Sequence, residues 1–124
     1  MQITPIPIAL DPNATYEFWL PEWNDILAEY RPTLVARHMT ARQAVDAGRE
    51  LSAAEHDSGE AVLARFCSFI SKSLVAWRNV LDANGEPIPF GAKPIDEVFT
   101  YGQILRMVEA MSAAARLSED QRKN

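Results

Sequence analysis

The side chains in this sequence that could take part in chemistry are few and widely spaced. The chain has two histidines, His38 and His56, and a single cysteine, Cys67. A zinc site needs several such ligands at characteristic spacings, and neither histidine has a cysteine or a second histidine at ligand spacing. The His56-Asp57 pair is also incomplete, because a metal-dependent hydrolase needs further His and Asp ligands. The sequence therefore predicts no metal site and no bound cofactor.

No arrangement of residues suits a catalytic nucleophile or an acid and base pair. Around Cys67 a helix is expected, and its neighbours three and four positions away are Leu63, Ala64, Ile70 and Ser71. Such surroundings raise the pKa of a thiol and leave it unreactive. The adjacent acids Asp96-Glu97 and Glu119-Asp120 would point about 100° apart on a helix. The glycines form no phosphate-binding loop. We therefore expect a protein that is not an enzyme.

The composition is that of one globular domain with an acidic balance. Of the 124 residues, 48% are hydrophobic and 23% are charged, which is typical of a chain that folds. The formal net charge of −5 argues against nucleic acid as the main partner, because phosphate binding needs clustered Lys and Arg. Apolar stretches are interrupted by Arg65, Lys72 or Arg78, so no segment is expected to span a membrane. The first residues lack the pattern of a secretory signal, which predicts a cytoplasmic protein.

The first third of the chain is expected to contain an extended arm and two short strands. Residues 1–13 carry Ile3, Ile6, Ile8 and Leu10 with prolines between them, a pattern that suits an extended arm. Residues 14–39 are rich in aromatics and predict a strand over residues 16–20. A helix is expected over residues 22–29, opened by Pro21 and ended by Pro32. A second strand over residues 33–39 could pair with the first.

Residues 40–78 are predicted to be helical. Thr40 is a good N-cap for a helix over residues 41–51. Residues 52–58 are either a linker or the first turn of the next helix, since Ser52 and Glu55 have capping-box spacing. A long helix is expected from about Gly59 to Arg78. Its apolar face recurs every three or four residues and consists of Val62, Phe66, Phe69, Ile70, Leu74 and Trp77.

The last part of the chain predicts a turn and then a helix. In residues 79–93 the pair Asn84-Gly85 lies between apolar runs, which favours a β-turn or small hairpin, since these two residues tolerate the positive φ that a type I′ turn needs. Residues 94–117 predict one helical turn over residues 95–99 and then a helix opened by a Thr100 and Gln103 capping box. Residues 118–124 are polar and expected to fray. The fold class is therefore a single mainly α (α+β) domain of three to five helices with a small β-hairpin or short strands.

Two groups of apolar residues have alternative roles. The buried side of the last helix is expected to be Ile104, Met107, Val108 and Met111. Methionines four positions apart fill a core more often than they form an adaptable binding face. The aromatic cluster of Phe18, Trp19 and Trp23 fits a core and an interface equally well, because so small a domain cannot easily bury it all.

The segment that ends the long helix and passes through the turn resembles a known family. Its pattern is similar to that of the tail assembly chaperones of bacteriophages with long, non-contractile tails. The residues that carry the resemblance are Trp77, Val80, Asp82, Gly85, Pro87, Pro89 and Phe90. The size, the acidity and the order of arm, helical middle and turn also fit that family, whereas the arm is richer in proline and aromatics than is typical.

The resemblance implies a function in virus assembly. Such chaperones coat the long helical tape-measure protein, keep it soluble and help to recruit tail-tube subunits around it. It implies a homo-oligomer in the cytoplasm of the bacterial host that is absent from the finished virion. Members are often made in two lengths by a frameshift, and the Arg122-Lys123-Asn124 ending is compatible with a slippery codon run. The residues expected to contact partner proteins are Trp19, Trp23, Trp77, Val80, Leu81, Pro87, Ile88, Pro89 and Phe90.

Two other classes of function remain open at this point. A small structural tail or head-tail connector protein would have a similar size and would stay in the particle. A small regulatory or antitoxin-like protein-binding module would have one tight partner in place of an oligomer.

Overall fold

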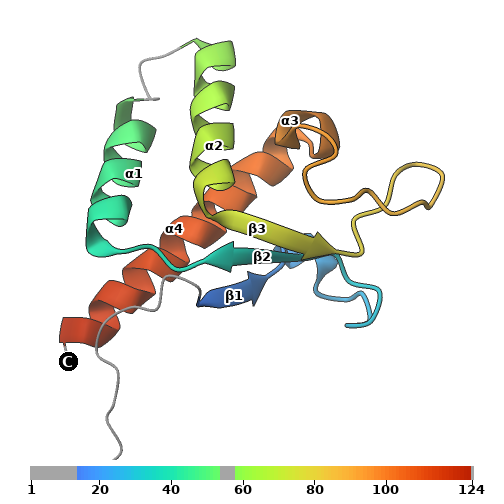
Figure 1. Ribbon diagram of the computed structural model, residues 1–124, viewed down its shortest axis with the longest axis horizontal. Coiled ribbons are helices and arrows are strands. Elements are labelled where there is room, and N and C mark those ends of the chain that lie inside the picture. Colours follow the sequence, from blue (N-terminus) through green and yellow to red (C-terminus); the bar gives the residue numbers. More distant parts are fainter. Residues whose placement is uncertain (1–13, 54–57, 124) are drawn as a thin grey trace, which may run out of the picture.

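An antiparallel three-stranded sheet forms where β-branched and aromatic residues gather in three short segments. The structure is a computed structural model that describes residues 14–53 and 58–123, with side chains up to residue 115. Strands β1 (Thr15–Phe18), β2 (Thr33–Arg37) and β3 (Leu74–Arg78) lie side by side in the order β1-β2-β3 (Figure 1). The expected pairing of the first two strands is confirmed, with Thr15 opposite Arg37 and Phe18 opposite Leu34.

The two faces of the sheet differ in polarity. Residues opposite each other in neighbouring strands share a face, so Phe18, Leu34 and Trp77 lie on one side. Leu34 is fully buried there. On the other side Arg78 of β3 reaches across β2 and donates two hydrogen bonds to the Glu17 carboxylate, at 2.6 and 3.0 Å. These hydrogen bonds lower the pKa of Glu17. One face therefore belongs to the core, and the other carries an exposed ion pair.

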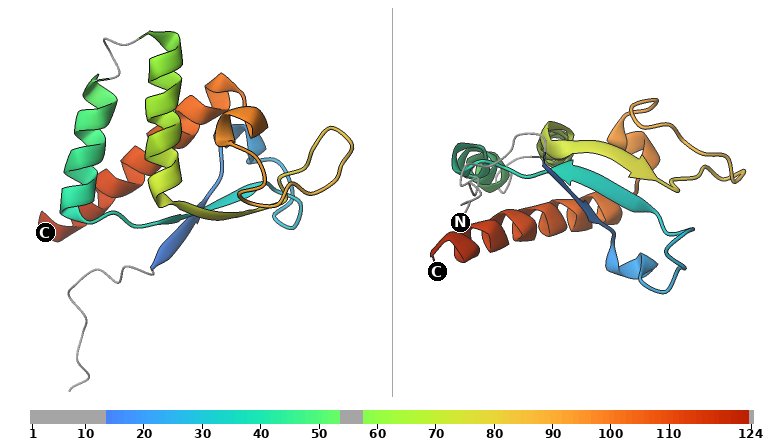
Figure 2. Two further views of the ribbon diagram at one scale, coloured as in Figure 1. Left: turned by 45° about the horizontal axis from the view of Figure 1, so that its top comes forward. Right: turned by 60° about the horizontal axis from the view of Figure 1, so that its bottom comes forward.

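Four α-helices accompany the sheet in the described part of the chain. Helix α4 (Tyr101–Lys123) crosses one face of the sheet, behind the strands in Figure 1 and beneath them in the right-hand view of Figure 2. Helices α1 (Ala41–Ala53) and α2 (Gly59–Ser73) stand side by side at one end of the sheet. Helix α3 (Ile95–Val98) is a single turn before α4, as expected. The fold is thus a single α+β domain.

The core lies between α4, the sheet and α2. Its fully buried larger side chains are Leu20, Leu34, Ile70, Ile104, Met107 and Met111. The predicted buried side of the last helix is confirmed, and Val108 is buried with it. Met107 and Met111 therefore fill the core and offer no exposed methionine face.

Two capping boxes fix where α1 and α4 begin. The Thr40 hydroxyl accepts from the Gln43 backbone N–H at 3.2 Å, while the Gln43 amide oxygen accepts from the Thr40 N–H at 2.9 Å. Thr100 and Gln103 repeat the arrangement at 2.9 and 3.1 Å. Each box satisfies helix N–H groups that have no partner within the helix. The capping box predicted at Thr100 is confirmed, as is the N-cap at Thr40.

Helix α2 is shorter than expected. It ends at Ser73, and residues 74–78, which we predicted as its last turns, form β3. Leu74 and Trp77 fit the helical spacing but also bring β-branched and aromatic neighbours that suit a strand. Pairing of Leu74 with Ala36 and of Trp77 with Leu34 decides in favour of the sheet.

Two other expected boundaries are wrong. In place of a helix over residues 22–29, the chain forms one 3-10 turn, η1 (Pro21–Trp23), followed by irregular turns. Pro21 does occupy the first position of that turn. At the other end, α4 continues through residues 118–123, where we expected fraying.

Some expectations fall partly or wholly outside the described residues. The arm over residues 1–13, His56 and the side chains of Glu119 and Asp120 lie there. Of the segment 52–58, the first two residues end α1. Ser58 caps α2 by accepting from the Ala61 N–H at 3.4 Å.

Tyr16 on the core face makes stability sensitive to high pH. Burial raises the pKa of Tyr16 to about 12. The unfolded side chain titrates near its ordinary value of about 10. Between these two pH values the unfolded chain loses a proton that the folded protein keeps, so stability falls as pH rises. We expect Tyr16→Phe to reduce this fall, measured as the urea midpoint between about pH 9 and about pH 12.

Candidate protein-interaction surface

Between β3 and α3 the chain leaves the sheet as a projecting hairpin over residues 79–93 (Figure 1). The Ile88 N–H donates to the Val80 carbonyl at 2.8 Å, and Leu81 pairs with Pro87. At the tip the Asp82 carboxylate accepts from the backbone N–H groups of Asn84 and Glu86, at 2.8 and 3.0 Å. The Asp82 side chain therefore closes the tip and fixes its conformation.

The turn at the tip differs from the expected type I′. That type needs positive φ at both central residues, but Asn84 does not have it. Gly85 alone has positive φ, 77°, and its N–H donates to the Asp82 carbonyl at 3.0 Å. This is the pattern of a three-residue loop in which a left-handed glycine follows a tight turn. The hairpin is confirmed, and the turn type is wrong.

Trp77 anchors the hairpin to the sheet. Its indole N–H donates to the Ile88 carbonyl at 2.7 Å, so one side chain ties the strand to the returning arm of the hairpin. The ring meets Phe90 and Phe99 edge-on, with centroids 5.0 and 5.7 Å away. Edge-to-face contacts of this kind add to the gain from burial. Trp77 is half-buried, so its main role is to hold the hairpin residues Ile88 and Phe90 in place. Little of its own ring is exposed for contact with a partner protein.

A second loop, over residues 24–31, lies beside the base of the hairpin. Asn79 has φ 59° and is the only non-glycine residue with positive φ in the described part of the chain. Its side-chain amide donates to the carbonyls of Glu29 and Arg31, each at 3.0 Å. The two segments are far apart in the sequence, and this one side chain joins them. Both lie at the end of the sheet away from α1 (Figures 1 and 2).

The loop over residues 24–31 is held in place by Arg31. Its guanidinium stacks over the Trp19 ring at 4.4 Å and donates to the carbonyls of Asn24 and Ile26. The Trp19 indole N–H donates to the Asn24 side chain at 2.8 Å. These contacts leave the apolar side chains of Leu27 and Tyr30 in solvent, each 66% exposed.

Most exposed large apolar residues of the described chain gather at this end. We call them the sheet-end residues: Trp19, Ile26, Leu27, Tyr30, Leu81 and Phe90. The two others, Val45 and Tyr101, lie on α1 and α4. Exposed apolar residues that gather in this way mark interaction sites, whereas scattered ones are ordinary.

The residues predicted from sequence to contact partners fall into two groups in the structure. Five of them are exposed: Trp19, Leu81, Pro87, Pro89 and Phe90. The others are part of the core or packed against it: Trp23, Trp77, Val80 and Ile88. Sequence reasoning missed Ile26, Leu27 and Tyr30, because the stretch before Pro32 was assigned to a helix over residues 22–29. The signal that could have found them is the turn, which exposes apolar residues that a helix would have buried.

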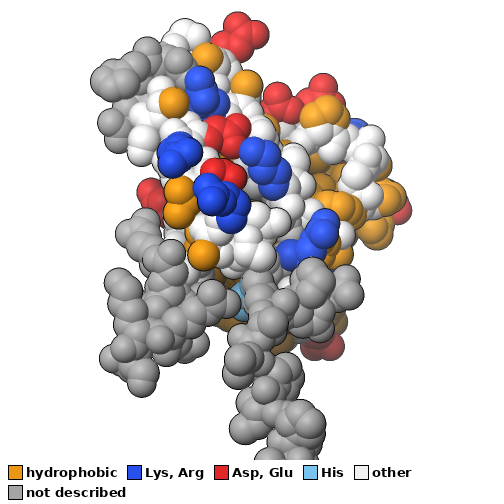
Figure 3. Space-filling view, turned by 60° about the vertical axis from the view of Figure 1, so that its left-hand side comes forward, with side chains coloured by type: hydrophobic (Ala, Val, Ile, Leu, Met, Phe, Trp, Pro, Cys, Tyr) orange, Lys and Arg blue, Asp and Glu red, His pale blue; other side chains and the backbone are white. Residues whose placement is uncertain are grey.

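Acidic side chains surround the sheet-end residues. The two loops carry the acids Asp25, Glu29, Asp82 and Glu86 and the bases Arg31 and Lys93, and Glu22 lies in η1 just before the first loop. Glu22 is paired with Arg106 of α4, and Arg31 is engaged within its own loop. On the side formed by α1 and α2, by contrast, Lys and Arg lie among Asp and Glu (Figure 3), as in the pair of Lys72 with Glu50 at 2.8 Å. The sheet end therefore favours a partner that is apolar with basic flanks.

The groups that could carry chemistry are not brought together in the described part of the chain. No cluster of three or more His, Cys, Asp and Glu residues there could hold a metal ion. Cys67 is half-buried, and burial, with the charge of Asp96, raises the pKa of its thiol. The His38 ring lies 4.9 Å from that of Tyr16. Along residues 14–53 and 58–123, no helix has the length and apolarity needed to cross a bilayer.

The joint at Asn79 gives a prediction for stability. Asn79→Ala removes two hydrogen bonds and replaces asparagine, which tolerates the left-handed conformation, by a residue that tolerates it less well, so we expect a loss of about 2 kcal/mol. Asn79→Gly removes the hydrogen bonds but suits the backbone, so we expect a loss of about 1 kcal/mol. Urea unfolding followed by circular dichroism measures both. Equal losses in the two variants would show that the backbone conformation contributes nothing.

Comparison of the chain with protein-family models, with curated proteins and with solved structures finds no match.

Proposed function

We propose that this protein is a tail assembly chaperone of a bacteriophage or prophage with a long, non-contractile tail. In this role it binds the tape-measure protein, keeps that helical protein soluble and helps to recruit tail-tube subunits. It acts as a homo-oligomer in the cytoplasm of the bacterial host and is absent from the finished virion. It acts by binding and has no catalytic step.

The observation that carries the proposal is the hairpin over residues 79–93. The residues of the family resemblance lie mostly in it, and two of its apolar side chains, Leu81 and Phe90, are 53% and 43% exposed. A folded protein gains nothing in stability by placing such side chains in water. Trp77 and the Asp82 turn hold them there, which supports a role in contacting another protein.

The form of the sheet end also supports a chaperone of this kind. A coat on a long helix needs many weak contacts that repeat along it. A small domain with several exposed apolar side chains at one end, and acids in the same loops, offers one such contact per copy. The acids speed the approach of a partner with basic flanks and keep the free domain soluble.

The neighbouring genes and co-expression with the tape-measure protein test the proposal. The gene should lie beside a very long reading frame that encodes a helical protein, and the two products should co-purify when expressed together. The tape-measure protein expressed alone should be insoluble. Co-expression that leaves it insoluble and uncaptured would refute the proposal.

The other classes of function give different results in the same material. Mass spectrometry of purified particles should detect no copies of this chain, and stoichiometric copies would assign it to the virion as a structural or connector protein. Light scattering should find an oligomer, whereas a monomer that forms one tight complex would indicate a regulatory module.

A further inference from the structure

Helix α1 is poorly covered by the rest of the domain. Of its residues only Ala47 is buried, and Val45 remains 48% exposed. A groove of about 300 Å³ runs between α1 and α4, and a second space of about 330 Å³ lies on the α2 side of α1. A helix whose apolar side is left open in this way lacks part of its packing. Part of the apolar side of α1 is therefore available to another segment.

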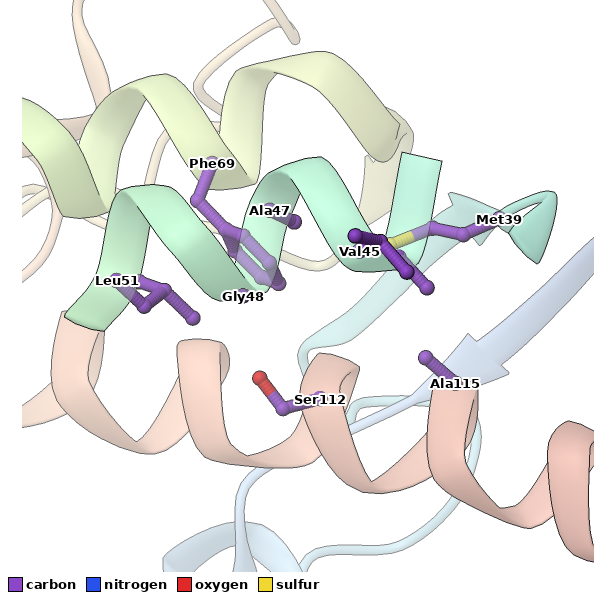
Figure 4. A pocket seen from close by; sticks show the side chains of 9 residues that line it. Met39, Val45, Ala47, Gly48, Leu51, Phe69, Ser112 and Ala115 are labelled. Atoms are coloured by element: carbon purple, nitrogen blue, oxygen red, sulfur yellow. The ribbon is translucent and has the colours of Figure 1, made fainter. Parts of the chain in front are cut away.

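The groove between α1 and α4 is apolar in its described lining, and its Met39 end lies toward the sheet. Figure 4 shows Met39 at one end and Leu51 at the other, with Phe69 of α2 at the back and Ser112 and Ala115 of α4 opposite. Ser112 supplies the single side-chain hydroxyl in the described lining, and no charged residue is part of it. The volume is about twice that of a cavity known to bind benzene. Two or three aliphatic side chains would fill it.

The first described residue, Ala14, lies near this end of the groove, so residues 1–13 of the same chain are attached there. The Ala14 carbonyl, at the start of β1, accepts from the His38 N–H at 3.3 Å. Met39, the residue that follows His38 in the chain, lines the groove. The arm is thus tethered beside its end, and a short tether gives an effective concentration on the order of millimolar.

We propose that residues 1–13 bind along the groove between α1 and α4 of their own chain, with Ile6, Ile8 and Leu10 against its apolar lining. In an extended segment these three side chains point to one side, about 7 Å apart. An extended arm of 13 residues reaches about 43 Å, whereas α1 is about 20 Å long. The arm can therefore follow the groove from Met39 to Leu51.

The composition of the arm fits the groove in two further ways. The first ten residues contain no charged side chain, which suits an apolar lining. A segment lying between two helices finds no strand to pair with, so each backbone N–H that it buries lacks a partner. Pro5 and Pro7 have no N–H and remove two of these groups. The inference concerns the far side of the molecule from the sheet-end residues and does not depend on the proposed function.

A disulfide between arm and groove tests the proposal in the full chain. In a Cys67→Ser background, the pair Ile8→Cys and Val45→Cys should form a disulfide within one chain at least about tenfold faster than the control pair Ile8→Cys and Leu81→Cys. Non-reducing gels and mass spectrometry distinguish bonds within and between chains. Equal rates for the two pairs would overturn the proposal. Bonds formed only between chains would also overturn it, because the occupant would then be the arm of a second copy.

Hydrogen exchange tests the same binding of residues 1–13 to the groove without added cysteines. Ile8→Asp should raise amide exchange over residues 44–51 and 112–115 by roughly fivefold or more, because those amides lose a cover. The matched control Gln2→Asp adds the same charge at a polar position of the arm and should change exchange little. Identical exchange in Ile8→Asp and wild type would refute the proposal.

Discussion

Replacing Leu81 and Phe90 together by serine is expected to weaken capture of the tape-measure protein by about a hundredfold or more. Apolar anchors at the centre of an interface each cost about 2 kcal/mol or more when truncated, and about 1.4 kcal/mol is a tenfold change in affinity. Both side chains are exposed, so the domain should stay folded. Titration of the purified variant against the tape-measure protein, with circular dichroism as the check on folding, measures the effect.

A control for this variant is available on another face. Val45→Ser removes an apolar side chain of comparable exposure, 48%, from α1. Val45→Ser should leave the affinity for the tape-measure protein unchanged. An equal loss of affinity in this variant would mean that binding does not depend on Leu81 and Phe90 in particular. Trp77→Ala is a poorer test of binding, because it also removes the hydrogen bond to the Ile88 carbonyl that holds the hairpin.

Ile104→Ala is expected to destabilise the domain by about 2–5 kcal/mol, a large part of the roughly 5–15 kcal/mol typical of a small domain. Ile104 is 1% exposed and lies on the side of α4 that packs on the core. Its truncation leaves a cavity that close-packed neighbours cannot fill. The difference in the free energy of unfolding between the variant and the wild-type protein, measured by urea unfolding, gives the loss.

A surface variant shows whether this loss comes from burial. Leu81→Ala removes a similar aliphatic side chain that is 53% exposed. Its effect on the free energy of unfolding should lie within about 0.5 kcal/mol. If both variants lost the same amount, the core would not be centred on α4.

The features that sequence reasoning predicted correctly depend on neighbouring residues alone. Thr40 and Thr100 each form caps with side chains three positions away, and the buried face of α4 follows from its own periodicity. The pairing of β1 with β2 was also predicted, because residues 33–39 are β-branched and apolar enough for a strand that could pair with the first.

The features that it missed depend on contacts between distant segments. Leu74 and Trp77 fit a helix as well as a strand, and only the partners in β2 decide between them. The loop over residues 24–31 looked helical because its shape is set by Arg31 and by Asn79, which is far away in the sequence. For the same reason, the candidate site was predicted in its hairpin half and missed in its loop half.

The direct passage from α2 into β3 limits how this domain can change in length. The helix ends at Ser73 and the strand begins at Leu74, so no loop separates them. An inserted residue at this junction would have to displace β3 by one position and turn its side chains to the opposite face. Natural variants should therefore gain or lose residues in the hairpin tip or between α1 and α2, and keep this junction fixed in length.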